Sequence, residues 1–146
     1  MTEPDLGRLL LEAHRALGAE LASVLVERGY PDARPGHAAL LLHIDRRSGS
    51  RLTELARRAR MTKQGMMLLV DDLEQRGYVR RVPDPDDARA KLVRLTARGR
   101  RYVTEARRTA AALETRVRRE LGERRYETLR GTLEELAARE GDSTER

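Results

Sequence analysis

Apolar residues at helical spacing mark long amphipathic helices near both ends of the chain. Between residues 6 and 28, leucines, alanines and valines recur every three or four positions, and Gly29 then ends the run. The same spacing returns after Thr96, continues through Val117, and appears again around Leu133. A helix with this spacing presents one apolar face. The pattern therefore predicts one long helix before Gly29 and two helices after Thr96.

The stretch between these helices divides into shorter elements. Pro31 and Pro35 fall in a segment that cannot continue the first helix, because proline lacks the backbone N–H that a helix interior needs. Helical spacing resumes over residues 37–46, and the run from Ser48 to Ser50 ends it. We therefore expect a second, shorter helix over residues 37–46.

Two more helices, joined by a tight break, come next. Thr53 is expected to cap a short helix that runs to about residue 60, because a threonine hydroxyl accepts a hydrogen bond from the first turn. Thr62 is expected to cap a longer helix that ends at Gly77. The inward face of the longer helix, at positions i, i+3, i+4 and i+7, consists of Met66, Leu69, Val70 and Leu73. This arrangement predicts a helix-turn-helix whose second helix is amphipathic.

A β-hairpin follows the second of these helices. Residues 78–83 and 90–95 tolerate β structure, and they flank a turn-rich run over residues 84–87. Beside a helix-turn-helix, such a hairpin is a wing. The predicted fold class is therefore mainly α with a small β-hairpin wing. The winged helix-turn-helix is expected over residues 35–95, with the wing at about residues 78–95.

Composition limits the compartment and the chemistry. The 146 residues suit one domain, and they contain no cysteine, which excludes disulfides and thiolate metal sites. No apolar run approaches the roughly 20 residues of a membrane span, and the chain does not start with a basic segment followed by an apolar one. We therefore expect a cytoplasmic protein without a membrane partner. His37 and His43 are six residues apart and point to different sides of a helix, so no metal ion is expected.

The charge balance favours a polyanionic partner. Thirty Lys and Arg residues against 24 Asp and Glu residues give a net charge of +6. Only Lys63 and Lys91 are lysines, so an arginine-rich genome explains the excess equally well. Aromatic residues form 3% of the chain, which disfavours stacking on single-stranded bases and makes double-stranded DNA the expected partner. No nucleophile with a base, no paired carboxylates and no phosphate-binding glycine loop occur at useful spacing, so we expect neither enzyme activity nor a cofactor.

One motif links the wing to the helix behind it. In DDARAKLVRLTARG, residues 86–99, Asp87 and Arg89 precede apolar positions and a Leu-Thr-x-x-Gly run that ends at Gly99. This motif resembles the wing-to-helix signature of the MarR (multiple antibiotic resistance regulator) family. The preceding TELARRARMTKQGMMLLVDDLEQRGYVRR is similar to the helix-turn-helix of that family, and the resemblance extends from about residue 6 to residue 139.

The resemblance implies one MarR-like domain over residues 1–146 that acts as a transcriptional regulator. It implies that the helical regions 6–34 and 96–140 form a homodimer, and that the dimer binds a pseudo-palindromic operator as a ligand-responsive repressor. Two recognition helices about 34 Å apart suit such an operator. The alternative is a non-specific architectural protein, since basic charge binds any duplex through its phosphates.

The outward face of the recognition helix carries the expected base contacts. Gln64 can pair with adenine, and Lys63 can pair with guanine or bind a phosphate. Met67 and Leu68 can contact thymine methyl groups, although ordinary exposed surface is the alternative for both. Thr62 joins them at the start of the helix.

The same helix departs from the family in its middle. Leu68 and Asp72 stand where relatives often have a basic residue, so the operator sequence is not transferable from them. We expect Asp72 to pair instead with Arg76, one turn further along the helix.

The wing carries the expected minor-groove contact. Residues two apart in a strand point to the same side, so Asp87 is expected to bind the guanidinium of Arg89 and hold it. A held arginine at a hairpin tip suits the narrow, negative minor groove, and a solvated salt bridge is the alternative. The expected phosphate contacts are Arg51, Thr53, Arg57, Lys63, Arg80, Arg81 and Lys91.

The resemblance also implies a small-molecule effector, since many relatives bind anionic aromatic compounds between the dimer helices and the DNA-binding lobe. The residues that suit such a site are His14, Tyr30, His37, His43 and Tyr102. An ordinary structural role is the alternative for each of them.

Overall fold

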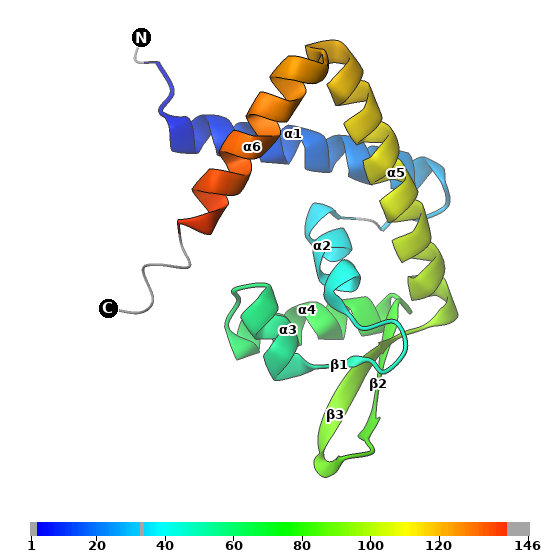
Figure 1. The fold of residues 1–146 in the computed structure, drawn as a ribbon. Coiled ribbons are helices and arrows are strands. Elements are labelled where there is room, and N and C mark those ends of the chain that lie inside the picture. The colour runs from blue at the N-terminus through cyan, green and yellow to red at the C-terminus, as the bar shows by residue number, and fades with distance from the viewer. Residues whose placement is uncertain (1–2, 33, 140–146) are drawn as a thin grey trace. The chain divides into compact units, whose positions relative to one another are not determined.

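The computed structural model describes residues 3–32 and 34–139 of the 146-residue chain. Residues 33 and 140, which belong to the predicted dimerisation regions, lie outside the described residues. The chain divides into two compact units, one that extends to Thr109 and one that begins at Ala110. The elements, coloured along the chain in Figure 1, are α1 (Leu6–Glu27), α2 (Pro35–His43), β1 (Ser50–Arg51), α3 (Leu52–Arg58), α4 (Lys63–Gln75), β2 (Val79–Asp84), β3 (Asp87–Leu95), α5 (Ala97–Leu121) and α6 (Glu123–Ala138).

Helix α1 begins and ends where the sequence predicts. The Asp5 carboxylate accepts a hydrogen bond from the backbone N–H of Arg8 at 2.9 Å, which caps the first turn. Gly29 follows the helix with a φ of +98°, a conformation that glycine adopts without strain. Leu25, near the end of the helix, is fully buried, whereas the leucines of its first turns are exposed.

Helix α2 is displaced from its predicted position. It begins at Pro35 rather than His37, because the fixed φ of proline suits the first helical position, where the missing N–H costs nothing. It ends at His43, since Ile44 adopts an extended backbone.

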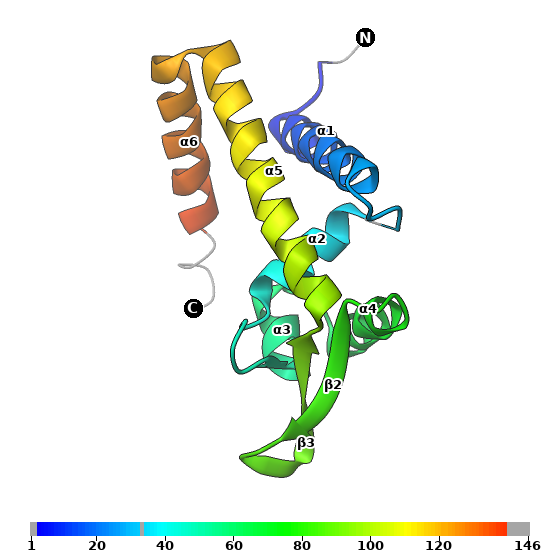
Figure 2. The same cartoon turned by 90° about the vertical axis from the view of Figure 1, so that its right-hand side faces the viewer.

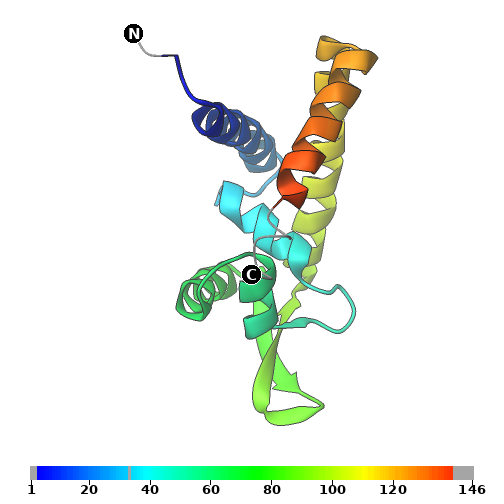
Figure 3. The same ribbon diagram turned by 60° about the vertical axis from the view of Figure 1, so that its left-hand side comes forward.

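Helices α3 and α4 form the predicted helix-turn-helix, and Figure 3 shows α2 beside them. The hydroxyl of Thr62 accepts a hydrogen bond from the N–H of Gly65 at 3.0 Å, so its predicted capping role is confirmed. The capping role predicted for Thr53 is wrong. The N-cap of α3 is Arg51, and no side chain caps this helix. Because Arg51 also pairs with Leu92 in the sheet, the chain passes directly from a strand into the helix.

The wing belongs to a three-stranded antiparallel sheet with the strand order β1-β3-β2. The short strand β1 was not predicted; it pairs Ser50 with Val93 of β3. The hairpin is longer than expected, because β2 extends to Asp84 and β3 begins at Asp87. Figure 2 shows this hairpin projecting beyond the helices of the first unit.

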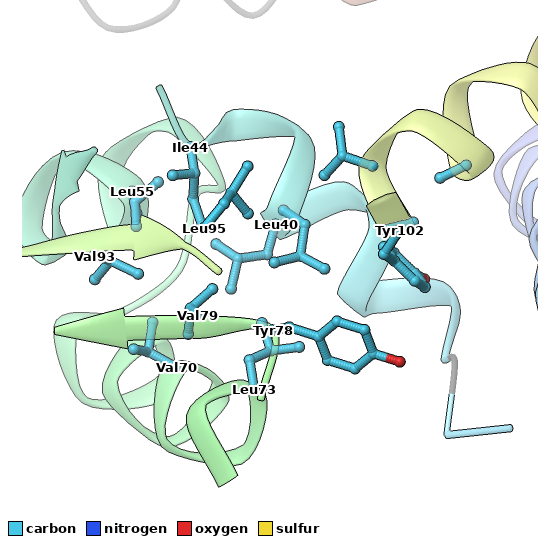
Figure 4. Packing of buried hydrophobic residues seen from close by; sticks show 14 of the residues in the cluster. Leu40, Ile44, Leu55, Val70, Leu73, Tyr78, Val79, Val93, Leu95 and Tyr102 are labelled. Atoms are coloured by element: carbon cyan, nitrogen blue, oxygen red, sulfur yellow. The ribbon is translucent and has the colours of Figure 1, made fainter. Parts of the chain in front are cut away.

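The core of the first unit lies between α2, α3, α4 and the base of the wing, as Figure 4 shows. Met66, Val70 and Leu73 of α4 are fully buried, and Leu69 packs at the edge of the core. The predicted inward face of α4 is therefore confirmed. Because this face is anchored in the core, the opposite face of the helix is held toward solvent.

The start of α5 packs tightly against the start of the wing. The hydroxyl of Thr96 accepts a hydrogen bond from the N–H of Gly99 at 3.1 Å and donates one to the carbonyl of Gly77. A Cβ atom added to Gly99 would lie only 2.0 Å from the carbonyl oxygen of Tyr78. In the Leu-Thr-x-x-Gly run, the threonine therefore ties the helix to the wing and the glycine makes room for the contact.

The second unit contains the rest of α5 and α6, which lie side by side in opposite directions (Figure 2). Gly122 connects them with a φ of +79°. Tyr126 of α6 is buried, and its hydroxyl donates a hydrogen bond to Glu114 of α5. The guanidinium carbon of Arg118 lies 4.4 Å from the centroid of the Tyr126 ring, so a cation–π contact supports the pairing.

Candidate nucleic-acid interface

The outward face of α4 combines polar and apolar side chains in its N-terminal half. Thr62, Lys63 and Gln64 are exposed at the start of the helix. Met67 and Leu68, one turn later, remain 44% and 65% exposed. The first turn of a helix also presents backbone N–H groups that have no partner within the helix. This face can therefore offer donors, acceptors and apolar atoms to the edges of bases.

The wing tip carries Asp87 and Arg89, which are both exposed. The predicted bond between their side chains is wrong. The Asp87 carboxylate instead accepts a hydrogen bond from the backbone N–H of Arg89 at 3.0 Å, and among the described residues no ion pair joins it to the Arg89 guanidinium. An aspartate side chain is short enough to bond the backbone two residues on, and this local bond competes with the guanidinium. Asp87 thus shapes the backbone of the tip rather than holding the arginine side chain.

The predicted phosphate-contacting residues differ in what holds them. Those with exposed side chains are Arg51, Thr53, Arg57, Lys63, Arg80 and Lys91. Although exposed, Arg51 donates from Nε to a carboxylate oxygen of the buried Asp84 at 2.7 Å. The half-buried Arg81 binds the carboxylates of Asp71 and Glu74 on α4. These two arginines thus connect parts of the protein to one another.

A cluster that the sequence analysis missed lies at the C-terminal end of α4. Asp32 accepts hydrogen bonds from the hydroxyl of Tyr78 at 2.6 Å and from Nη2 of Arg98 at 3.1 Å. Its other oxygen lies 3.7 Å from Nη1 of Arg76, and Arg98 donates to the carbonyl of Arg76 at 2.9 Å. Burial acts to raise the pKa of Asp32, but the Tyr78 hydroxyl and the two arginines hold it below its ordinary value. No local pattern signals the cluster, because Asp32 is 46 residues from Tyr78 and 66 from Arg98.

Helix α4 is also tied to α2. The predicted pair of Asp72 and Arg76 is confirmed, with Nε of the arginine 2.9 Å from Oδ1. The other carboxylate oxygen lies 3.0 Å from Nε2 of His37, a side chain that is nearly fully buried. Nδ1 of His37 has no hydrogen-bond partner in the described part of the chain. Burial lowers the pKa of His37, Arg76 and Arg34 lower it further, and Asp72 opposes the shift.

The five predicted effector contacts lie in different surroundings. Tyr30 and Tyr102 are buried, and their ring centroids are 5.2 Å apart. The hydroxyl of Tyr102 is buried without a hydrogen-bond partner among the described residues, and burial raises its pKa to about 12. His14 and His43 are exposed, whereas His37 is held between α2 and α4. The structure therefore brings the two tyrosines together and leaves two of the histidines on the surface.

Within residues 3–32 and 34–139, no group of three or more His, Asp or Glu side chains is arranged to hold a metal ion. No helix in that part of the chain has both the length and the apolar character needed to cross a membrane.

A helix-turn-helix with one exposed face on its second helix, followed by a β-hairpin wing, defines the chain as a winged helix-turn-helix protein. Its residues 28–90 match the MarR family model. A comparison with curated proteins gives no match.

Solved structures of MarR-family proteins have the same fold. The reduced form of MarR from E. coli is 22% identical, with a TM-score of 0.77 over 93% of this chain and 98% of that chain. CouR from Rhodococcus jostii RHA1 bound to p-coumaroyl-CoA is 26% identical, with a TM-score of 0.71 over 93% and 96% of the two chains. The transcriptional repressor CouR bound to a 23-mer DNA duplex is 25% identical, with a TM-score of 0.76 over 91% and 92%. Over residues 28–90 the chain is similar to the MarR family, and it is a DNA-binding transcriptional regulator rather than an enzyme.

Proposed function

We propose that this chain represses transcription as a cytoplasmic homodimer that binds a pseudo-palindromic operator and is released by a small-molecule effector. The observation that carries the proposal is the exposed face of α4, which runs from Thr62 to Leu68 while Met66 and Val70 anchor the other face in the core. A helix anchored in this way presents its outward side chains to a major groove in one fixed orientation. Gln64 and Lys63 are the proposed hydrogen-bonding contacts, and Met67 and Leu68 the apolar ones.

The wing supplies a second contact in this proposal. Arg89 is exposed near the hairpin tip, and the negative potential of a narrow minor groove attracts an arginine. Asp87 supports it by fixing the backbone of the tip. The exposed phosphate-binding side chains are Arg51, Thr53, Arg57, Arg80 and Lys91. Residues 35–95 thus form the DNA-binding part of a single MarR-like domain.

A second copy of this chain is the proposed partner of the exposed leucines. Leu6, Leu10 and Leu17 of α1 are between 37% and 60% exposed, and their spacing of four and seven residues places them near one face of the helix. In the second unit, Leu129 and Leu133 are exposed one turn apart on α6. Apolar rows of this kind support association through the regions 6–34 and 96–140.

The proposed effector is an anionic aromatic compound. A related structure, that of CouR, contains p-coumaroyl-CoA. In this chain the hydroxyl of Tyr102 is buried beside the ring of Tyr30 and has no partner among the described residues. A buried donor without an acceptor is unfavourable, and an oxygen atom of a bound ligand would satisfy it. That His14, His37 and His43 also contact the effector stays a prediction.

Selection of bound duplexes from a random pool tests the DNA-binding proposal. We expect one inverted repeat whose half-sites are about 10 bp apart, and a footprint confined to it. The logarithm of affinity should fall with the logarithm of salt concentration by about 0.9 for each neutralised phosphate. An architectural protein would select no repeat and would protect all duplexes alike. A flat salt response would contradict DNA binding through this surface.

Sedimentation equilibrium tests the dimer. The wild-type chain should sediment at twice the monomer mass, and the double variant Leu10→Glu, Leu17→Glu should sediment as a monomer. Leu42→Glu is the matched control, because Leu42 is as exposed as Leu10 but lies on α2. A monomeric wild type would overturn the dimer.

The effector is tested with p-coumaroyl-CoA as the probe. It should release the selected duplex from the wild-type chain. Tyr102→Phe should weaken this release while leaving DNA affinity without the compound unchanged, because Tyr102 is buried and its hydroxyl cannot contact a duplex. Equal release from both proteins would remove the proposed role of the hydroxyl.

A further inference from the structure

Arg81 on strand β2 connects the wing to the recognition helix α4. Its Nη1 donates a hydrogen bond to Oε1 of Glu74 at 2.8 Å, and its Nη2 donates one to the carboxylate of Asp71. Its backbone N–H donates to Oε2 of Glu74 at 2.9 Å. Asp71 and Glu74 are three residues apart on the helix, so both carboxylates project from the same side. A single residue of the wing therefore makes three hydrogen bonds to the recognition helix.

The place of Arg81 in the sheet explains these contacts. β2 is an edge strand, and Arg81 lies opposite Val93 of the central strand. Alternation along the strand puts Arg81 on the same side as the buried Val79 and puts Arg80 on the other. The side chain of Arg81 is only 21% exposed, while Arg80 is on the surface. The carboxylate of Glu74 also covers a backbone N–H that would otherwise face the open edge of the sheet.

The charge around Arg81 argues against a phosphate contact. The guanidinium contributes +1 and the carboxylates of Asp71 and Glu74 contribute −2, so the three side chains together carry −1. A phosphate that approached this group would meet a net negative charge and would compete with two carboxylates already bound. The planar fork of an arginine suits a bridge between two carboxylates, whereas a lysine presents a single point charge.

We propose that Arg81 is a positioning residue that sets the orientation of the wing relative to the recognition helix. In this role it places Arg89 at the minor groove when α4 occupies the adjacent major groove. The inference rests on the proposed function for those two DNA contacts. The sequence analysis predicts from the charge of Arg81 that this residue contacts a phosphate directly. The positioning role takes the place of that prediction.

The first test uses the free protein and does not depend on DNA. Glu74→Ala should speed hydrogen exchange at the backbone amide of Arg81 by roughly fivefold or more, because that amide loses its acceptor. Glu54→Ala, which removes an ion-paired glutamate from α3, is the matched control and should leave the exchange unchanged. An unchanged rate at Arg81 in Glu74→Ala would overturn the inference, whether or not the chain binds DNA.

The second test is a double-mutant cycle on the selected duplex. Arg89→Ala should weaken binding at least about tenfold in the wild type and less than about threefold in Arg81→Gln, because a misplaced wing no longer brings Arg89 to the groove. Arg81→Lys keeps the charge but cannot bridge two carboxylates, so it should behave like Arg81→Gln. The salt slope should fall in both, because a misplaced wing also loses its cationic contacts with DNA, and Arg89→Ala should then lower the slope no further. Arg80→Gln is the control for a phosphate contact, and it should lower the slope by about 0.9 and add its cost to that of Arg89→Ala.

Two results of the cycle would overturn the inference. One is a cost of Arg81→Gln that adds in full to the cost of Arg89→Ala, with slope reductions that also add, which would make Arg81 a phosphate contact. The other is full affinity in Arg81→Gln. If Arg81→Gln does not fold, the near-isosteric double variant Asp71→Asn, Glu74→Gln takes its place in the cycle. In this double variant too, Arg89→Ala should weaken binding less than about threefold. A wild-type chain that selects no repeat contradicts the proposed function, and the exchange experiment then still tests whether Glu74 holds strand β2 against α4 at Arg81.

Discussion

The guanidinium of Arg51 binds the carboxylate of Asp84 across the central strand of the wing sheet. Arg51 lies on β1 and Asp84 at the end of β2, with β3 between them. Nε of Arg51 donates to Oδ2 at 2.7 Å, and the backbone N–H of Asp86 in the hairpin turn donates to Oδ1 at 2.9 Å. The bond from Asp86 and the bond from Arg51 hold the pKa of Asp84 below its usual value, although burial opposes them. One carboxylate thus fixes both the turn and the neighbouring strand.

Loss of this connection should loosen the wing in two steps. Arg51→Ala removes the bond between the strands, and Asp84→Ala removes that bond together with the one in the turn. Limited digestion with trypsin should therefore cleave after Arg89 about fivefold faster in Arg51→Ala, and faster again in Asp84→Ala. Arg57→Ala, which changes an exposed arginine on α3, serves as the control. Wild-type cleavage rates in both variants would show that the wing does not depend on Asp84.

Gly99→Ala should disrupt the junction between the wing and α5. The added Cβ would lie 2.0 Å from the carbonyl oxygen of Tyr78, which already accepts the N–H of Thr96 at 3.0 Å. The helix cannot retreat without breaking that bond, so we expect a loss of about 3 kcal/mol in the free energy of unfolding, measured by urea denaturation. Gly131→Ala is the control. An added Cβ at Gly131 meets nothing within 4 Å, and alanine favours a helix, so this variant should be at least as stable as the wild type.

Local patterns were sufficient to predict the recognition helix. Thr62 caps it, Met66 and Leu73 point inward, and Gln64 is exposed, all as the sequence predicts. Each of these features depends on residues within two or three helical turns, where the period of the backbone fixes which side chains share a face. The cap of α5 at Thr96 was predictable for the same reason.

Contacts between distant segments were not predictable in this way. The partners of Asp32 come from the start of the wing and from α5, so they follow from the fold and not from any spacing. Charge alone suggested that Arg81 binds phosphate. Its inward role had a weak signal, since Arg81 alternates with the buried Val79 along the strand.

The predicted bond between the side chains of Asp87 and Arg89 failed for a different reason, although the two residues are close in sequence. Its side chain bonds the nearest backbone N–H, that of Arg89, rather than the guanidinium, because the local bond orders fewer rotatable groups.

Gln64→Ala should relax base preference at one position in each half-site. A bidentate amide contact with adenine contributes about 1–3 kcal/mol of discrimination, and alanine cannot make it. The measurement compares the affinities of duplexes that carry each of the four bases at that position. Gln75→Ala is a matched control, because Gln75 is equally a glutamine on the surface of α4 but lies in its last turn. An equal loss of affinity for all four bases would instead make Gln64 a phosphate contact.

The free energy of unfolding should depend on pH through His37, in a range higher than the one in which carboxylates titrate. The groups that face it are Asp72 and Arg76 of α4 and Arg34 before α2, and burial is the main cause of its lowered pKa. Above pH 6.5 the histidine is neutral in both the folded and the unfolded chain, so its contribution is fully present. As the pH falls below 6.5, the unfolded chain takes up a proton that the folded chain does not, and the free energy of unfolding decreases. The decrease stops once the folded chain also protonates His37.

His37→Gln should flatten this part of the pH profile, because a glutamine amide can still donate to Asp72 but does not titrate. One group contributes at most about 1.4 kcal/mol per pH unit, and urea denaturation between about pH 5 and pH 7.5 resolves such a slope. His43→Gln, an exposed position on the same helix, should keep the wild-type slope. The lowered pKa values of Asp32, Asp72 and Asp84 act separately, since their stabilising effect is lost only as the pH falls below about 4. If His37→Gln kept the full slope between pH 5 and 7, a different group would have to be the source of the titration.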